Sequence, residues 1–248
     1  PVKEPFHKLV HQGMILGENG IKMGKRFPKY VVNPSDIVRE YGADTLRLYE
    51  MFMGPLEVSK PWSMTGVAGA RKFINRVWNF FAESANITDT DDGKLTKIYH
   101  QTVKKVTADY EALAFNTAIA QMMVFVNEVY KNGSCPKAYA EGFIKMLSCI
   151  TPHVGEEIWQ LLGHDDTIAY ESWPTYSEEK CKDAEVNIAV QVNGKMRGTV
   201  LMDADLSNEE VVANAVADEK IAKFLQKQGG QIVKTIVVKN KLVNLIVK

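Results

Sequence analysis

The stretch GVAGARKFINRVWNFF, residues 66–81, begins the part of the chain that decides its fold. Phe73, Val77 and Phe80 recur at helical spacing, which predicts a helix that turns one face into a core. Cationic residues lie beside this apolar stripe and are expected on the solvent face. The stretch therefore predicts a helical domain around it.

Further helices are expected after this stretch, over residues 95–110, 115–130 and 139–162, the last interrupted at Thr151-Pro152. The links between them are short, and helices of this length joined by short links pack as an antiparallel bundle. We assign these large apolar residues to the core of the bundle: Phe73, Val77, Trp78, Phe80, Phe125, Phe143 and Trp159.

The hydrophobic period changes from about 3.6 to about 2 near residue 183, where we place a domain boundary. Asn193-Gly194 is a tight-hairpin signal, and Ser207 and Glu210 have the spacing of a capping box. The expected elements are strands over 188–192, 196–202, 232–238 and 242–247, with one helix over 207–228. Together they form a small ββαββ domain, so the chain as a whole is predicted to be α+β and multidomain.

The charges are unevenly distributed although the net charge is zero. Lys and Arg outnumber Asp and Glu in residues 1–40 and 186–248, and are outnumbered in residues 135–185. Two basic ends fit a protein that contacts a polyanion at separate places, because phosphate contact needs local positive charge.

Composition also excludes several classes of protein. No apolar run approaches the roughly 20 residues needed to span a bilayer, so no membrane segment is expected, and no secretory leader is evident. The three cysteines, at 135, 149 and 181, are too scattered for a disulfide framework or a metal site. They predict reduced thiols in a cytoplasmic protein.

A short basic loop, Ile21-Lys22-Met23-Gly24-Lys25-Arg26, is the most informative stretch for chemistry. It places three cations within five residues on a loop with glycines at 20 and 24. Lysine can approach a phosphate as a mobile point charge, and arginine as a bidentate fork. Taken alone, such a stretch is more often an ordinary solvated loop.

In its context this loop resembles the Lys-Met-Ser-Lys-Ser loop of class I aminoacyl-tRNA synthetases. The segment after the loop is similar to the leucyl, valyl and isoleucyl group, and several stretches resemble the bacterial leucyl-tRNA synthetases most closely. These stretches are Gln12-Gly13-Met14, VVNPSDIV at 31–38, YGADTLR at 41–47, MFMGPLE at 51–57, Lys60-Pro61-Trp62, residues 66–78 and IAVQVNGKMRG at 188–198. The resemblance covers nearly the whole chain and is weakest over about 85–185.

The resemblance implies a catalytic role for Lys22 and Lys25, which would bind the ATP phosphates and stabilise the charge that develops during amino-acid adenylation. The implied ATP site comprises Lys22, Met23, Gly24, Lys25 and Arg26, with Mg²⁺ accompanying ATP in the full-length enzyme. Gly24 and Arg26 stand where the family has serines, and residues 27–30 include one extra residue. These departures remove two hydroxyl contacts and make the loop more flexible at Gly24.

The resemblance also implies two tRNA-binding domains. Residues 1–40 would end an α/β catalytic domain, 41–183 would be a helical anticodon-binding-type domain, and 184–248 a C-terminal tRNA-binding domain. Contacts with tRNA are expected from Arg71, Lys72, Arg76, Lys195, Arg197, Lys239 and Lys241. The resemblance implies that those in the C-terminal domain contact the outer corner of the tRNA. Scattered cations suit recognition of RNA shape and phosphates.

The expected parent is a leucine–tRNA ligase of which this chain is a C-terminal fragment. The chain starts at Pro1, and neither a His-Ile-Gly-His-type motif nor an editing domain is found. We therefore expect a monomer that binds tRNA(Leu), retains no cofactor and is inactive alone, while leucine and ATP are bound by the intact enzyme. Two alternatives stay open. One is a valyl or isoleucyl enzyme, although the coiled coil or zinc region typical of their ends is not seen; the other is a non-catalytic RNA-binding protein.

Overall fold

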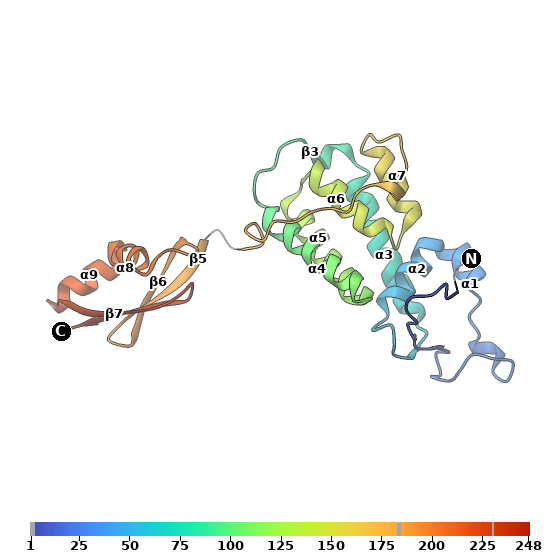
Figure 1. Cartoon of the computed structure of the whole chain (residues 1–248), viewed down its shortest axis with the longest axis horizontal. Coiled ribbons are helices and arrows are strands. Elements are labelled where there is room, and N and C mark those ends of the chain that lie inside the picture. The colour runs from blue at the N-terminus through green and yellow to red at the C-terminus, as the bar shows by residue number, and fades with distance from the viewer. Residues whose placement is uncertain (1–2, 183–184, 230) are drawn as a thin grey trace. The chain divides into compact units, whose positions relative to one another are not determined.

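The computed structural model describes residues 3–182, 185–229 and 231–248, and it contains two compact units, Pro1–Cys181 and Lys182–Lys248 (Figure 1). The first unit is mainly helical and the second combines a sheet with helices, so the predicted α+β class is confirmed. Residues on both sides of position 40 belong to the same compact unit. Ile15, Met23 and Ile37, which come before this position, pack in or against the core formed by the helices that follow. The boundary predicted near residue 183 falls at residues 183 and 184, which lie outside the described residues.

The first unit is a bundle with short strands at its edges. Its helices are α1 (Pro34–Tyr41), α2 (Ala43–Phe52), α3 (Met64–Phe81), α4 (Thr96–Glu111), α5 (Phe115–Asn132), α6 (Lys137–Ser148) and α7 (Pro152–Leu161). Two pairs of short parallel strands join β1 (Ile15–Leu16) to β2 (Lys60–Pro61) and β3 (Ile87–Thr88) to β4 (Cys135–Pro136). Three 3-10 turns complete it: η1 (Pro28–Tyr30), η2 (Ser84–Asn86) and η3 (Ile168–Tyr170).

The helices begin and end where local capping chemistry directs. The side chain of Asn33 accepts from the backbone N–H of Ser35 at the start of α1, and Ser63 caps α3 in the same way. Gly133 ends α5 in the left-handed conformation. Nowhere in the described part of the chain is a helix long and apolar enough to cross a membrane.

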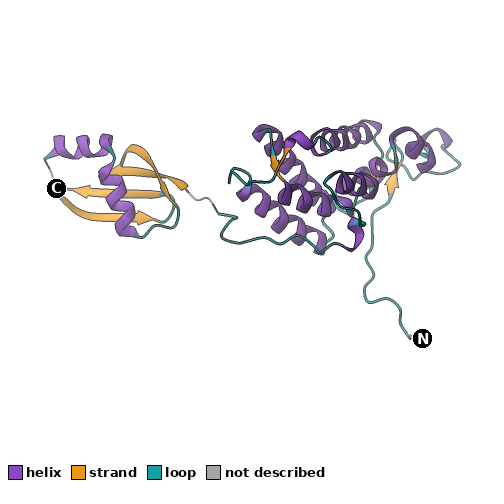
Figure 2. Ribbon diagram, turned by 90° about the horizontal axis from the view of Figure 1, so that it is seen from above, coloured by secondary structure: helices purple, strands orange, loops and turns teal. Residues whose placement is uncertain are grey.

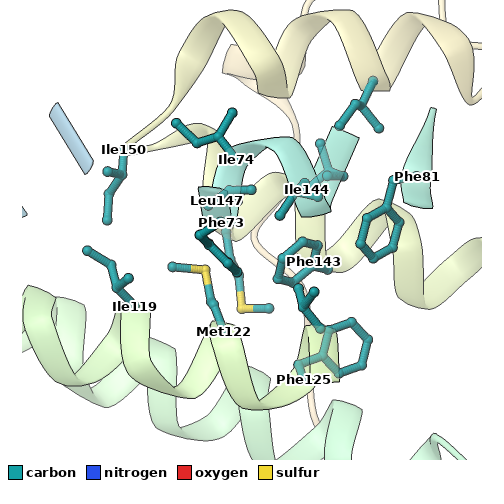
Figure 3. Packing of buried hydrophobic residues seen from close by; sticks show 14 of the residues in the cluster. Phe73, Ile74, Phe81, Ile119, Met122, Phe125, Phe143, Ile144, Leu147 and Ile150 are labelled. Atoms are coloured by element: carbon teal, nitrogen blue, oxygen red, sulfur yellow. The ribbon is translucent and has the colours of Figure 1, made fainter. Parts of the chain in front are cut away.

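The core of the bundle is aromatic and aliphatic and comes mainly from α3, α5 and α6 (Figure 3). Phe143 stacks on Phe81, with ring centroids 5.1 Å apart, and lies 5.3 Å from Phe125. The core assignment of Trp78 is wrong, because its side chain is 39% exposed. Val77 lies near the middle of the buried face of α3. Because consecutive helical residues are turned by about 100°, the next side chain, Trp78, lies at the edge of that face.

After α7 the chain continues mainly as a long loop (loops are teal in Figure 2), and residues 173–181 of it pack along α4 as a strap. Trp173 Nε1 donates to Thr107 Oγ1 at 2.7 Å, and Lys104 pairs with Glu178 at 2.7 Å. The backbone N–H of Ser177 donates to Nδ1 of the buried His100 at 3.2 Å. The path of the chain out of the bundle is therefore set by side chains of α4.

The second unit has a four-stranded sheet with its helices packed on one face. Its elements are β5 (Glu185–Val192), β6 (Lys195–Asp203), α8 (Asn208–Ala217), α9 (Glu219–Gln228), β7 (Ile232–Val238) and β8 (Leu242–Val247), and the strand order is β6-β5-β8-β7. Asn193 and Gly194 both have positive φ, as the tight primed turn between β5 and β6 requires. Alternate residues of β5, such as Ile188 and Val190, are buried beneath Val211 of α8.

The single helix expected over 207–228 is two helices, so the unit is ββααββ. Asp218 lies between them with an extended backbone (φ −62°, ψ 129°), and its side chain accepts from the backbone N–H groups of Lys220 and Ile221. This carboxylate starts a new helix in place of continuing the old one. The capping box of Ser207 and Glu210 at the start of α8 is confirmed.

Candidate functional sites

The basic loop is held at its beginning and open at its end. Lys22 forms an isolated antiparallel bridge with Leu16 of β1, which fixes its backbone. The side chain of Met23 packs against the bundle core, and its sulfur accepts from the backbone N–H of Val32 at 3.4 Å. Beyond it, the N–H of Phe27 donates to the carbonyl of Gly24 at 3.0 Å and closes a turn.

This arrangement leaves the loop cations available to a ligand. Lys22, Lys25 and Arg26 are exposed, and within the described residues no carboxylate pairs with either lysine. The guanidinium carbon of Arg26 lies 5.4 Å from the centroid of the Phe27 ring. Because Lys22 and Lys25 flank the anchored Met23, the loop can present two mobile ammonium groups to one polyanionic ligand.

Gly24 has no steric reason to be glycine. A Cβ at this position meets no atom within 4 Å, and the backbone is not in the left-handed region. Gly13 differs, because a Cβ there would lie 2.2 Å from the carbonyl carbon of Val58. Gly13 therefore permits the close approach of the two chain segments that support the loop, since its N–H also donates to the carbonyl of Leu56 at 2.7 Å.

The helix α2, which comes after the loop, carries two long-range clamps that sequence reasoning did not find. The carboxylate of Asp44 at the start of α2 accepts from the backbone N–H of Val154 at 2.8 Å and contacts Nδ1 of His153 at 2.8 Å. Arg47, one turn later, donates to the carbonyls of Ile150 and Cys149 at 2.7 and 3.1 Å. Thus α2 caps the start of α7 and the end of α6, more than 100 positions away.

The three cations expected to bind tRNA on α3 differ in their engagement. Arg71 donates to the carbonyl of Tyr41 at 3.2 Å and so caps the end of α1. The guanidinium of Arg76 lies 4.8 Å from the ring centroid of Tyr130, whose hydroxyl donates to the Arg76 carbonyl. Lys72 is exposed and has no partner among the described residues. All three are on the surface of one helix, and Lys72 is the most available for contact with a phosphate group.

The four cations predicted in the second unit lie at two different turns: Lys195 and Arg197 come just after the β5–β6 turn, and Lys239 and Lys241 flank the β7–β8 turn. β5 and β8 run parallel, with Ala189 opposite Leu242 and Val192 opposite Leu245. The turn after β5 therefore lies at the end of the sheet where β8 finishes, and the turn before β8 lies at the other end. The two pairs form two patches and not one.

Each of these patches has one engaged and one free cation. The guanidinium of Arg197 stacks on Phe224 of α9, 4.0 Å from the ring centroid. Lys239 pairs with Asp205 at 3.0 Å, and this contact and a hydrogen bond from Asn240 lower the pKa of that carboxyl. Two exposed lysines have no ion-pair partner in the described part of the chain: Lys195 and Lys241.

Two further observations concern metals and Trp62. The described residues contain no group of three or more His, Cys, Asp or Glu placed to hold a metal ion. Trp62 is 4% exposed and packs edge-on against Tyr49, with ring centroids 4.9 Å apart. Trp62 therefore anchors the segment between α2 and α3.

Two segments of the chain match known protein families. Residues 2–63 match the family of class I tRNA synthetases (I, L, M and V), and residues 92–213 match the anticodon-binding domain of tRNA ligase, a range that continues through β5 and β6 into α8 of the second unit. A chain in the crystal structure of the ternary complex of Agrobacterium radiobacter K84 agnB2 LeuRS, tRNA and LeuAMS is similar at 27% identity and a TM-score of 0.73. That match covers 100% of this chain and 34% of the other. The apo form of Mycobacterium tuberculosis methionyl-tRNA synthetase matches at 13% identity and a TM-score of 0.45, over 54% of this chain and 35% of that one.

Proposed function

We propose that this chain, a member of the class I tRNA synthetases of the I, L, M and V group, is the C-terminal part of a leucine–tRNA ligase. The observation that carries the proposal is the likeness to a LeuRS over the whole chain, the ββααββ unit included. In the intact protein the reaction would be the ATP-dependent joining of leucine to tRNA(Leu). This chain supplies the phosphate loop and surfaces for tRNA.

The loop geometry supports a role in holding ATP phosphates. Lys22 and Lys25 are exposed, unpaired within the described residues and carried on either side of the anchored Met23. Mobile ammonium groups can follow charge as it moves onto a leaving polyphosphate, and this is the function we assign to them. ATP, with Mg²⁺, would supply the activated phosphorus centre, and the remaining nucleotide contacts would come from outside this chain.

The exposed cations of both units support tRNA as the partner. Lys72 on α3 and Lys195 and Lys241 at the two ends of the terminal sheet are the free charges that we assign to phosphate contacts. We add Arg197, which keeps its charge while it stacks on Phe224 in the same patch as Lys195. Because the two patches of the terminal unit lie at opposite ends of a sheet, they suit contacts with two separate backbone segments of a folded RNA.

Binding of tRNA(Leu) by this chain, measured by fluorescence anisotropy over a salt series, tests the proposal. Each phosphate contact releases counterions, so affinity should fall steeply with salt. The double variant Lys195→Gln/Arg197→Gln should weaken binding. It should also reduce the slope of log affinity against log salt concentration by about 1–2. Glutamine at 197 keeps a side chain over Phe224 and so limits the loss of packing.

The matched control is Lys105→Gln/Lys131→Gln, which removes the same charge from two lysines that already pair with Asp109 and Glu128. It should leave the salt dependence unchanged. Equal binding of tRNA(Leu), tRNA(Val) and tRNA(Ile) would contradict the leucine assignment, and no loss in the 195/197 variant relative to the control would remove the terminal patch from tRNA binding.

The phosphate role needs a longer protein that includes the catalytic motifs. There, Lys25→Ala should slow leucine-dependent pyrophosphate exchange at least about tenfold, because one charge-stabilising donor is lost. Lys29→Ala, a neighbouring cation stacked on Tyr30, is the control and should have little effect. An unchanged exchange rate in Lys25→Ala would exclude this lysine from the reaction.

A further inference from the structure

A surface pocket of about 510 Å³ lies in the first unit between α2, β2, α3 and α5, separate from the basic loop. Its walls are mostly apolar and come from Phe52, Met53, Pro61, Ala70 and Met123. This volume lies within the range of sites that hold small organic molecules, roughly 300–1,000 Å³. No residue proposed for ATP or tRNA contact lines it.

An exposed glycine, Gly69, lines the pocket, and packing does not explain it. Gly69 lies in the interior of α3, where glycine costs about 1 kcal/mol relative to alanine. A Cβ at Gly69 meets no atom within 4 Å. Gly66, one turn earlier, differs, because a Cβ there would lie 2.5 Å from the ring of Tyr49. Gly66 is therefore required by packing, whereas Gly69 leaves open space that a side chain would fill.

The polar groups of the pocket are hydrogen-bond donors. Lys60 uses one of its three N–H groups on the carbonyl of Gly54 at 2.9 Å. The hydroxyls of Tyr49 and Ser63 accept backbone N–H groups, from Ser63 and Gly66 respectively, and neither donates to any described residue. None of the described residues that line the pocket carries a carboxylate; Glu50 lines a smaller neighbouring cavity of about 70 Å³, which shares Lys60 and Met53 with the pocket.

The environment of Lys60 adds support. Burial lowers the pKa of its ammonium group, because the charge loses water, and the nearby Glu57 offsets only part of this effect. Glu57 makes no ion pair with Lys60 within the described residues. An anion entering the pocket would restore favourable interactions to this charge.

From this combination we infer that the pocket binds a hydrophobic monocarboxylate, with its carboxylate on Lys60 and its apolar body against Phe52, Met53 and Met123 over Gly69. A cationic ammonium group and two hydroxyls that are free to donate, with no carboxylate beside them in the pocket, favour an acceptor-only head group. A free α-amino acid fits poorly, because the carbonyl of Gly54 already accepts from Lys60 and no carboxylate lines the pocket to pair with an ammonium group. This inference does not depend on the proposed function.

The test uses three probes of one shape: 4-phenylbutyrate, its neutral amide and 4-phenylbutylamine. Binding is followed by NMR of the chain carrying ¹³C-methyl methionine, with the Met53 and Met123 signals assigned by Met→Leu variants. We expect both methyl groups to shift, with the carboxylate binding about tenfold or more tighter than the amide, and the amine weakest. Lys60→Met should bring carboxylate and amide to equal affinity without weakening the amide.

Gly69→Leu fills the open space and should abolish binding of all three probes. Because leucine is a better helix former than glycine, this variant should unfold at the same or a higher urea concentration, which separates a blocked pocket from a damaged fold. Asn79→Leu is the control, since position 79 is an exposed position of the same helix that does not line the pocket; this variant should bind the carboxylate normally. The inference is overturned if the three probes bind equally, if the two methyl signals do not move, or if Gly69→Leu still binds.

Discussion

Replacing Asp44 with alanine tests the clamp that joins α2 to the start of α7. The Asp44 side chain is 7% exposed and accepts from the backbone N–H of Val154 and contacts His153 Nδ1, both at 2.8 Å. A hydrogen bond to a charged group contributes about 1.5–3 kcal/mol, and the loss of a helix N-cap costs about 1 kcal/mol. These two contributions overlap at Val154, so we expect Asp44→Ala to lower the free energy of unfolding of the first unit by about 2–3 kcal/mol.

Urea unfolding followed by tryptophan fluorescence is the suitable assay, because all four tryptophans, at 62, 78, 159 and 173, belong to the first unit. The matched control is Asp36→Ala. Its carboxylate also lies in the first turn of a helix but is exposed and paired with the exposed Arg39 at 2.7 Å, so its loss should cost less than about 0.5 kcal/mol. If Asp44→Ala costs no more than Asp36→Ala, the clamp does not stabilise the bundle.

Three further outcomes are expected. Burial lowers the pKa of His100 below its ordinary 6.5, so the unfolded state takes up the proton first as the pH falls. The contribution of His100 to the free energy of unfolding of the first unit should therefore be level above pH 6.5 and fall below it, and His100→Gln should flatten this slope in urea titrations. The contact with Lys239 lowers the pKa of Asp205 below 3.8, so the second unit should lose stability as the pH falls through that value, and circular dichroism of Lys239→Met should show a smaller loss. Residues 182–248 expressed alone should unfold cooperatively, because they bury their own cluster around Val190, Val243 and Leu245, and a dispersed NMR spectrum is the measurement.

Most elements could be predicted because their signals are local. The strands β7 and β8 have the expected limits, since alternation and the turn at Asn240, with its positive φ, are both encoded within a few residues. The split between α8 and α9 also had a local cause, the capping carboxylate of Asp218. The apolar spacing continues across it, and this continuity concealed the break.

The clamps of α2 could not be predicted from local patterns. In the sequence, Asp44 and Arg47 are ordinary polar positions of a short helix, and their partners lie between the end of α6 and the first turn of α7. Only the packing of the bundle brings α2 to that segment. The positions of the terminal lysines have the same limitation, because the parallel pairing of β5 with β8 decides that Lys195 and Lys241 lie at opposite ends of the sheet.

The departures of the basic loop from its family pattern become intelligible from the contacts that hold the loop in place. Its position depends on the backbone bridge of Lys22 and on the sulfur and packing of Met23, and neither contact involves a hydroxyl. The replaced positions, Gly24 and Arg26, lie beyond this anchor, where a side chain meets open space or stacks on Phe27. Changes there can alter the mobility of Lys25 while leaving the placement of Lys22 intact. We therefore expect the two lysines to differ in tolerance: a serine at 24 should tighten the motion of Lys25 and leave Lys22 unchanged, which side-chain ¹⁵N relaxation of the two ammonium groups in Gly24→Ser would measure.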